Sequence, residues 1–289
     1  MGGAKVFLDY DQKQLDDAYD QSVYAPNRDQ LIARGIRNSE LARERLGEPL
    51  HFSYGPDEIE QLDVYKAPRP GAPVHVYIHG GAWRSRRAAE YAFAAEMFLR
   101  AGVHFVVPDF AAVTEVGGSL LVMAAQVRSA LAWVHRHASS FGGDASRLYV
   151  SGTSSGAHLA GVLAATDWSL EGLPPDPVQG YVLANGMYDL RGPRLSKRSS
   201  YVSFTDEIEA ALSPQRHLER IRAPIILLYG SLETPEFQRQ SRDFAAALRG
   251  AGKRVELILA EGYNHFELAE TLGHPYGPVG RAILSQMGS

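Results

Sequence analysis

The sequence predicts an α/β fold, with a mostly parallel central sheet that is covered by helices on both faces. Short strands alternate with helical segments along most of the chain, which is the pattern of βαβ units. Most of these strands are apolar throughout, as expected when helices cover both faces of a sheet. No repeat, low-complexity tract or linker interrupts this order, so we expect one sheet with one core.

The predicted elements follow one another from the N-terminus. Residues 11–47 are polar and helical, and Ala25-Pro26-Asn27 divides them into two pieces because proline interrupts a helix. Strands are expected at residues 50–54, 61–66, 73–80, 103–107, 147–150, 178–183, 224–229 and 255–260. Helices are expected at residues 87–101, 122–140, 156–166, 236–251 and 277–287. Right-handed helical connections therefore join the parallel strands.

Residues 187–220 break the alternation of strands and helices. They are polar, contain Pro193 and Pro214, and lie between two predicted strands. Excursions of this length inside a compact domain are usually functional or mobile, so we predict a cap or lid over the strand ends. The expected organisation is a single domain over residues 1–289, with an N-terminal helical arm at about 1–48 and a cap or lid at about 187–220.

The composition narrows the classes of function. The net charge is −4 and charges of both signs are interspersed, so the basic patch of a nucleic-acid-binding protein is missing. The chain has no cysteine, which excludes disulfides and thiolate catalysis. It has no apolar signal-peptide core at its start and no apolar run of 18 residues. We expect a soluble, cytoplasmic protein without a membrane span; monomer and homodimer both stay open.

A G-x-S-x-G motif occupies Gly152–Gly156, between a predicted strand and a predicted helix. That context is typical of a nucleophile elbow, a turn so sharp that its flanking residues must be small. The turn raises the Ser154 hydroxyl above the sheet, and the helix N-terminus favours developing negative charge. We predict Ser154 as the nucleophile; a glycine-rich turn without chemistry is the alternative.

A second glycine motif, His79-Gly80-Gly81-Ala82-Trp83, ends the strand at 73–80. Hydrolases with a nucleophile elbow keep part of their oxyanion hole in such an upstream loop. Backbone N–H groups of Gly80 or Gly81, with that of Ser155, would bind the oxyanion. The alternative is a plain turn after a buried strand, and the His79 side chain is expected to brace the loop rather than react.

The general base is expected late in the chain, because these enzymes order their triad as serine, acid and histidine. His265 follows the last strand through a short loop, which brings it to the same sheet edge as Ser154. Other histidines fit less well, since they lie in strands, on helices or beside a proline: His75, His104, His135, His137, His158 and His274. We predict His265 as the base.

The triad acid has three candidates in the sequence. Glu233 follows the strand at 224–229 by a few residues, and a buried carboxylate there would fix the tautomer of His265. Glu236 lies close by and could instead favour the start of a helix, and Asp189 follows the preceding strand. Glu233 is the preferred prediction, with the other two left open.

Three aromatic residues near these motifs, Trp83, Phe110 and Tyr188, are candidates for an apolar substrate pocket, together with parts of 187–220. Core packing is the alternative for each of them. The chain has no H-E-x-x-H motif and no phosphate-binding or dinucleotide-binding glycine loop, and its histidines lack metal-ligand spacing. No cofactor and no metal are therefore expected.

These motifs resemble the hormone-sensitive-lipase-like branch of the α/β-hydrolases and, within it, the arylformamidases, also called kynurenine formamidases. The similar segments are Tyr19-Asp20, residues 79–83 and 152–156, Leu212-Ser213-Pro214, Glu233-Thr234-Pro235-Glu236-Phe237, Arg239-Gln240-Ser241 and Asn264-His265-Phe266. The resemblance implies an α/β-hydrolase fold, with Glu233 as the acid. It also implies hydrolysis of aryl formamides such as N-formylkynurenine to formate and an arylamine. Ala82 and residues 109–112 depart from the family pattern near the expected pocket.

The sequence therefore predicts a serine hydrolase that cleaves a small-molecule amide or ester through an acyl-enzyme. An aryl formamide is the expected substrate. A general carboxylesterase is the first alternative, because the same mechanism cleaves esters. An inactive hydrolase fold that serves as a ligand receptor is the second.

Overall fold

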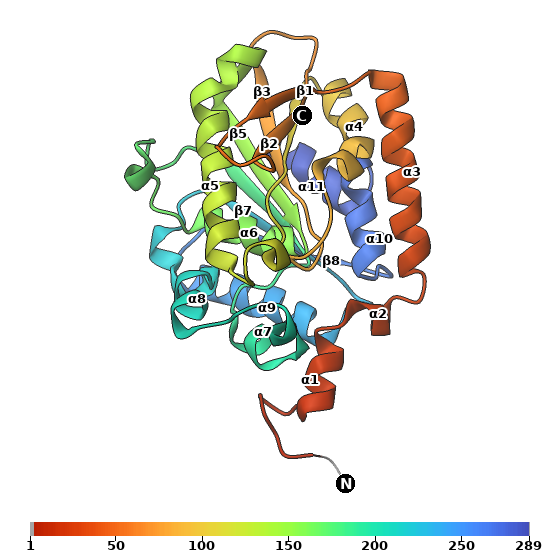
Figure 1. The fold of residues 1–289 in the computed structure, drawn as a ribbon, viewed down its shortest axis with the longest axis vertical. Coiled ribbons are helices and arrows are strands. Elements are labelled where there is room, and N and C mark those ends of the chain that lie inside the picture. The colour runs from red at the N-terminus through yellow and green to blue at the C-terminus, as the bar shows by residue number, and fades with distance from the viewer. Residues whose placement is uncertain (1–2, 289) are drawn as a thin grey trace.

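The structure is a computed structural model that describes residues 3–288, and its centre is a twisted sheet of eight strands within that range (Figure 1). The strands are β1 (Leu50–Ser53), β2 (Gln61–Tyr65), β3 (Ala72–Ile78), β4 (His104–Pro108), β5 (Gly143–Thr153), β6 (Gly180–Ala184), β7 (Ile225–Gly230) and β8 (Val255–Ala260). Their order across the sheet is β1-β2-β4-β3-β5-β6-β7-β8. The β1–β2 and β2–β4 pairs are antiparallel and the others are parallel, which confirms the predicted mostly parallel α/β sheet.

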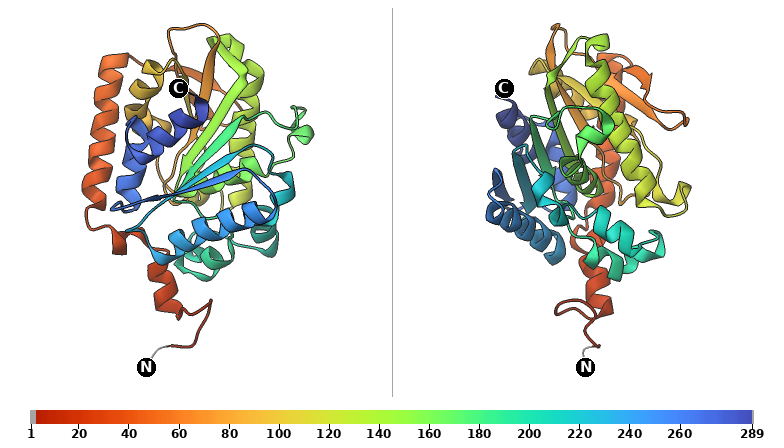
Figure 2. Two further views of the ribbon diagram at one scale, coloured as in Figure 1. Left: turned by 180° about the vertical axis from the view of Figure 1, so that it is seen from behind. Right: turned by 90° about the vertical axis from the view of Figure 1, so that its left-hand side faces the viewer.

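Helices cover both faces of this sheet, as Figure 2 shows from two sides. The helices are α1 (Gln12–Ala18), α2 (Gln21–Tyr24), α3 (Arg28–Leu46), α4 (Ala95–Arg100), α5 (Leu120–His137), α6 (Ser155–Ala164), α7 (Arg191–Leu195), α8 (Asp206–Ala211), α9 (Pro235–Gly250), α10 (His265–Glu270) and α11 (Pro278–Met287). Buried apolar residues of α5, α6 and α9 pack on one face, and those of α4, α10 and α11 pack on the other.

The two faces follow from the alternation of side chains along each strand. In β3, Val76 and Ile78 join the core beneath α5 and α6, whereas Tyr77 between them joins the opposite core. In β4, Val106 and Val107 divide in the same way. All of these side chains are buried, so the uniformly apolar strands of the sequence are explained by burial on both sides.

The parallel register brings the sequence motifs to one edge of the sheet. Ile78 at the end of β3 pairs with Gly152 of β5, so the glycine loop and the serine motif leave the sheet side by side. On the other side of β5, Thr153 pairs with Ala184 at the end of β6. Further along, Gly230 of β7 pairs with Ala260 of β8. Ligand sites in open α/β sheets lie at such carboxyl ends of strands.

Most predicted elements lie within a few residues of the observed ones, and the differences have local causes. The helix expected at 87–101 begins as a 3₁₀ segment at Ala88–Ala94 and becomes α-helical only in α4. The strand expected at 147–150 begins earlier, since β5 already pairs with β3 from Gly143, before a register shift at Pro73/Val74. His265, expected after a short loop, begins the short helix α10, which the sequence did not indicate and whose N-cap is Asn264.

The N-terminal arm and the excursion at 187–220 meet at the carboxyl edge of the sheet. The excursion folds into α7, α8 and short 3₁₀ turns, and α7 lies beside α1 in Figure 1. Gln12 donates to the carbonyl of Leu195 at 2.9 Å, and the Lys197 amide donates to Asp16 at 2.6 Å. Within residues 3–288, no helix is both long and apolar enough to cross a membrane.

Candidate active site

The backbone of Ser154 has the strained geometry of a sharp turn between strand and helix. Its φ is +58° and its ψ is −126°, a region that non-glycine residues rarely occupy and that costs about 1–3 kcal/mol. A Cβ on Gly152 would collide with the Gly156 carbonyl, and one on Gly156 would collide with the Ile78 carbonyl. Both glycines are therefore required for β5, the turn and α6 to pack this closely.

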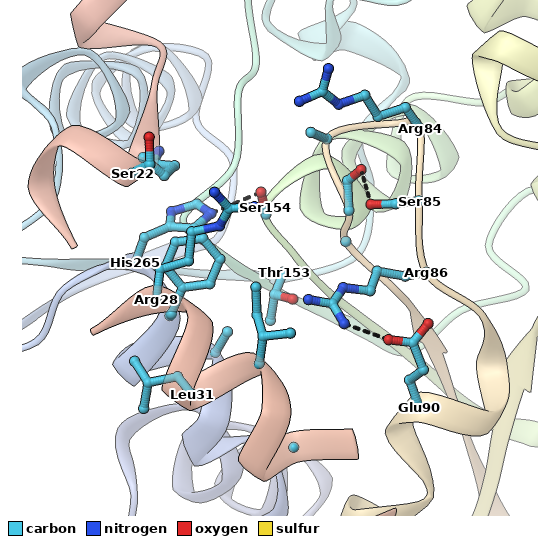
Figure 3. Close-up of a pocket in the computed structure, with 18 of the residues that line it drawn as sticks. Ser22, Arg28, Leu31, Arg84, Ser85, Arg86, Glu90, Thr153, Ser154 and His265 are labelled. Atoms are coloured by element: carbon cyan, nitrogen blue, oxygen red, sulfur yellow. Dashed lines mark hydrogen bonds and ion pairs between the residues drawn. The ribbon is translucent and has the colours of Figure 1, made fainter. Parts of the chain in front are cut away.

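His265 lies directly against Ser154. Its Nε2 is 2.9 Å from the Ser154 Oγ, a normal hydrogen-bond distance (Figure 3). The ring is almost completely buried, and it forms a T-shaped contact with Phe237 with 5.1 Å between ring centroids. Asn264 accepts hydrogen bonds from the Phe266 and Glu267 amides and so fixes the start of α10, from which the His265 side chain projects.

Of the three carboxylates considered as the acid, Glu233 is the one that faces His265. Its Oε2 is 3.4 Å from Nδ1 of the ring, and its Oε1 is buried without a hydrogen-bond partner among the described residues. Glu236 points elsewhere: it accepts from Tyr19 at 2.8 Å and from two nitrogens of Arg239 at 2.7 and 2.8 Å. Asp189 pairs with Arg216 at 3.1 Å.

The loop at 79–83 folds back over the serine turn. A Cβ on Gly80 would lie 2.9 Å from the Thr153 carbonyl and 3.2 Å from the Ser154 Cβ, so the Gly80 backbone lies against the serine. Gly81 has φ +122°, and a Cβ there would collide with the Ser85 carbonyl. Within residues 3–288, the Gly81 amide donates no hydrogen bond to a protein group, whereas the Gly80 amide interacts with the Tyr91 hydroxyl. The Ser155 backbone begins α6 beside them.

Two contacts hold this loop in place. The Trp83 amide donates to the Ser155 Oγ at 3.2 Å, which links the loop to the serine turn. The His79 Nδ1–H donates to the Gly80 carbonyl at 2.9 Å, while the ring stacks on Phe110. Burial lowers the pKa of His79 to about 4, so its ring is neutral at pH 7 and braces the loop.

A cavity of about 490 Å³ opens in front of Ser154 and His265. Figure 3 shows Arg28 and Leu31 of the arm on one side of the serine, and Arg84 and Arg86 on the other. Further lining residues come from the arm, the loop after β3, the excursion and α10: Tyr19, Ile32, Ile36, Tyr91, Phe93, Lys197, Arg198, Tyr201 and Phe266. The arm and the excursion therefore form much of the cavity wall.

Comparisons with known proteins place the chain in a family. A family model described as BD-FAE matches residues 62–175. The kynurenine formamidase of Salmo salar is 31% identical over 262 residues, which are 86% of this chain and 85% of that protein. That of Danio rerio is 28% identical and covers 90% of both chains. The chain belongs to the α/β-hydrolase family that includes the kynurenine formamidases.

The α/β-hydrolase fold is also evident in solved structures. Esterase LipW from Mycobacterium marinum superposes with a TM-score of 0.71 at 20% identity, over 93% of this chain and 89% of that chain. At this identity the superposition establishes the fold alone. Together, the comparisons establish a hydrolase of the esterase and formamidase group.

The three aromatic residues predicted to line the pocket of this α/β-hydrolase are packed in its core instead. The Trp83 indole N–H donates to His158 Nδ1 at 3.2 Å and its side chain is buried. Phe110 is covered by the His79 ring, and Tyr188 is fully buried and stacks on Phe244. None of the three lines the cavity. The prediction relied on their positions near the motifs in the sequence, and these positions do not determine whether a side chain points into the cavity or into the core.

Two groups of residues in this site were not predicted from the sequence. Asn185, directly after β6, donates from Nδ2 to the His265 carbonyl at 2.9 Å and accepts the Ser154 amide at Oδ1 at 2.9 Å. A polar residue at the carboxyl end of a buried strand is the signal that could have indicated it. The cavity residues of the arm, such as Arg28 and Leu31, had no comparable local signal.

Proposed function

We propose that this family member is a serine hydrolase that cleaves carboxylic amides or esters through an acyl-enzyme, and that its substrate is an aryl formamide. The observation that carries the proposal is the 2.9 Å contact between the Ser154 Oγ and the His265 Nε2, with the Glu233 carboxylate on the other side of the ring. In this arrangement the histidine can act as general base for the serine hydroxyl, and the carboxylate orients the histidine and stabilises its charged form.

In the first half of the reaction, the Ser154 Oγ attacks the carbonyl carbon while His265 Nε2 takes the hydroxyl proton. Glu233 accepts the Nδ1–H of the same ring, which keeps Nε2 free as acceptor and stabilises the imidazolium. The oxyanion would bind the amides of Gly80, Gly81 and Ser155. The free Gly81 amide supports this role, because preorganised donors need no rearrangement when charge develops.

In the second half, the tetrahedral intermediate collapses and the carbon–nitrogen bond breaks. His265 Nε2 returns its proton to the departing nitrogen, which leaves as the arylamine. A water then attacks the formyl-enzyme with His265 as base, and formate and the free serine result. The atoms balance without a cofactor.

An aryl formamide is proposed because two relatives that match most of the chain are kynurenine formamidases and because the cavity has aromatic and aliphatic walls. Leu31, Tyr201 and Phe266 offer apolar surface to an aryl ring beside the serine. We also propose that the arm and the excursion at 187–220 act together as a cap on a single hydrolase domain. The hydrogen bonds that join the arm to the excursion, from Gln12 to Leu195 and from Lys197 to Asp16, support this role.

The test measures kcat/KM on N-formylkynurenine, on a short p-nitrophenyl ester and on an aryl acetamide. Formamidase activity requires kcat/KM to be highest on N-formylkynurenine. A preference for the ester by more than about tenfold would assign the protein to the carboxylesterases instead.

A fluorophosphonate probe tests the nucleophile independently of the substrate. Wild type should be labelled at Ser154 and Ser154→Ala should not, with kcat falling on the order of 10⁶-fold in the variant. Ser151→Ala is the matched control, because Ser151 is buried in β5, bonded to His75, and faces away from the cavity residues. Folded wild-type protein that resists the probe would indicate a ligand receptor rather than an enzyme.

A further inference from the structure

Arg198, in the excursion at 187–220, lines the same cavity as Ser154 and is only 4% exposed. Its neighbours in the excursion are neutralised by carboxylates: Lys197 pairs with Asp20, and Arg194 pairs with Glu209 at 3.0 Å. Arg198 forms no ion pair with any carboxylate of residues 3–288. A cation taken out of water without a counter-charge is costly, so an unpaired buried arginine at a cavity wall indicates an anionic ligand.

The guanidinium of Arg198 is held rigidly but keeps donors free. It donates to the Tyr201 hydroxyl at 2.9 Å and to the Tyr19 carbonyl at 3.1 Å. It also lies over the rings of Trp83 and Phe237, 5.3 and 5.8 Å from their centroids. Its Nε–H has no partner among the described residues. Two of its five N–H groups are used and the Nε–H is closed off from solvent, so the N–H groups left on the two terminal nitrogens are the donors available to a carboxylate.

The charge around it favours the same ligand. Arg84, across the cavity wall, is another arginine without an ion pair among residues 3–288, and its guanidinium lies 4.6 Å from the centre of the Tyr201 ring. By contrast, Arg86 in the same loop is paired with Glu90. Two uncompensated cations therefore meet at Tyr201, on the side of the cavity formed by the excursion.

We propose that Arg198, assisted by Arg84, forms an anion subsite that binds a carboxylate carried by the substrate and thereby determines specificity. This inference rests on the proposed function, because the cavity it concerns is the one in front of Ser154. It narrows the substrate to a molecule with a negatively charged group as well as a scissile carbonyl. It also gives the excursion a role in recognition, since Phe237 separates Arg198 from His265 by two ring contacts.

The test compares benzoate with benzamide, which has nearly the same shape and no charge. Two readouts are used: competitive inhibition of p-nitrophenyl acetate hydrolysis, and the ligand-induced rise of the unfolding midpoint, which does not depend on turnover. Wild type should bind benzoate about 10–100-fold more tightly than benzamide. In Arg198→Met this ratio should fall to about one. In Arg281→Met, which removes an exposed arginine of α11 outside the cavity, it should stay unchanged.

Arg198→Lys keeps the charge but loses the planar donor set, so it should retain part of the preference. If Arg198→Met does not fold, the wild-type ratio and the Lys variant still decide the question. Equal binding of benzoate and benzamide by wild type, or an undiminished ratio in Arg198→Met, would overturn the subsite. If inorganic phosphate inhibits as strongly as benzoate, Arg198 binds free anions in general. That result would also overturn a subsite for the carboxylate of the substrate. If wild-type protein keeps its preference for benzoate but is not labelled by the fluorophosphonate probe, the hydrolase mechanism is refuted and the anion subsite is not.

Discussion

Asn185 accepts a hydrogen bond from the Ser154 amide at its Oδ1, 2.9 Å away, and through Nδ2 it also holds the His265 carbonyl. One buried side chain thus joins the two loops whose side chains must stay 2.9 Å apart. Its φ of +48° is in the left-handed region, which asparagine tolerates better than most residues. Because the side chain touches backbone groups only, Asn185 acts as a positioning residue.

The first prediction concerns this link. Asn185→Gly keeps the left-handed backbone accessible and removes both hydrogen bonds, so kcat should fall about 10–100-fold while KM changes little. Asn185→Asp keeps the acceptor for Ser154 but places a carboxylate oxygen against the His265 carbonyl, and should be at least as impaired. Steady-state kinetics with a thermal-unfolding control would check this. A loss of stability with unchanged kcat would show that Asn185 only supports the fold.

The second prediction separates two glutamates that lie three residues apart. Glu233→Gln removes the carboxylate that faces His265, so kcat should fall about 10²–10⁴-fold with little change in the unfolding midpoint. Glu236→Gln weakens an ion pair with Arg239, which keeps its contact with Asp243, so it should lower the free energy of unfolding by about 1–3 kcal/mol and leave kcat of the folded enzyme nearly unchanged. Urea unfolding and kinetics on both variants measure the contrast. The reverse pattern would make Glu236 the acid.

The third prediction is an acid lability caused by neutral buried histidines. Burial lowers the pKa of His158 to about 4, that of His79 to about 4 and that of His75 to about 3, from 6.5 when exposed. Above pH 6.5 these rings are neutral in both states. As the pH falls from 6.5 to about 4, the unfolded chain binds protons that the folded protein does not, so stability is lost.

His158→Gln tests one of these contributions. Glutamine can still accept from Trp83 or donate to the Leu212 carbonyl but does not take up a proton. The slope of unfolding free energy against pH should therefore decrease by up to about 1.4 kcal/mol per pH unit between pH 4 and 6.5. Denaturant melts at several pH values measure this slope.

The strand–turn–helix context made Ser154 and His265 predictable, because a local pattern and a fixed chain order determine both positions. The register that joins Ile78 to Gly152, and the link through Asn185, depend on pairings between strands and could not be derived from local pattern. The parallel sheet was predictable from the alternation of strands with helices and from the uniformly apolar strands, since burial on both faces requires apolar residues at successive positions.

The pocket was the part least accessible from sequence. Trp83 is the last residue of the proposed oxyanion loop, yet its positive φ of +63° and its hydrogen bond to His158 direct it into the core. Leu31, which lines the cavity, comes from the arm, more than 100 residues from Ser154. Arg198 belongs to the excursion at 187–220, which the sequence did indicate as part of the pocket, although no motif singled out the residue. Long-range packing of this kind has no periodic signature in one sequence.

The last prediction concerns Gly81, whose amide is a proposed oxyanion donor. At φ +122° an alanine is strained, and its Cβ would collide with the Ser85 carbonyl, so the loop must shift. Gly81→Ala should therefore lower kcat about 10²–10³-fold through loss of one donor. Gly71→Ala is the matched control, because its φ is +67° but open space surrounds its Cβ position. It should cost about 1 kcal/mol of stability and leave kcat unchanged. If both variants lost stability alike and kept full kcat, the loop at 79–83 would have no part in binding the oxyanion.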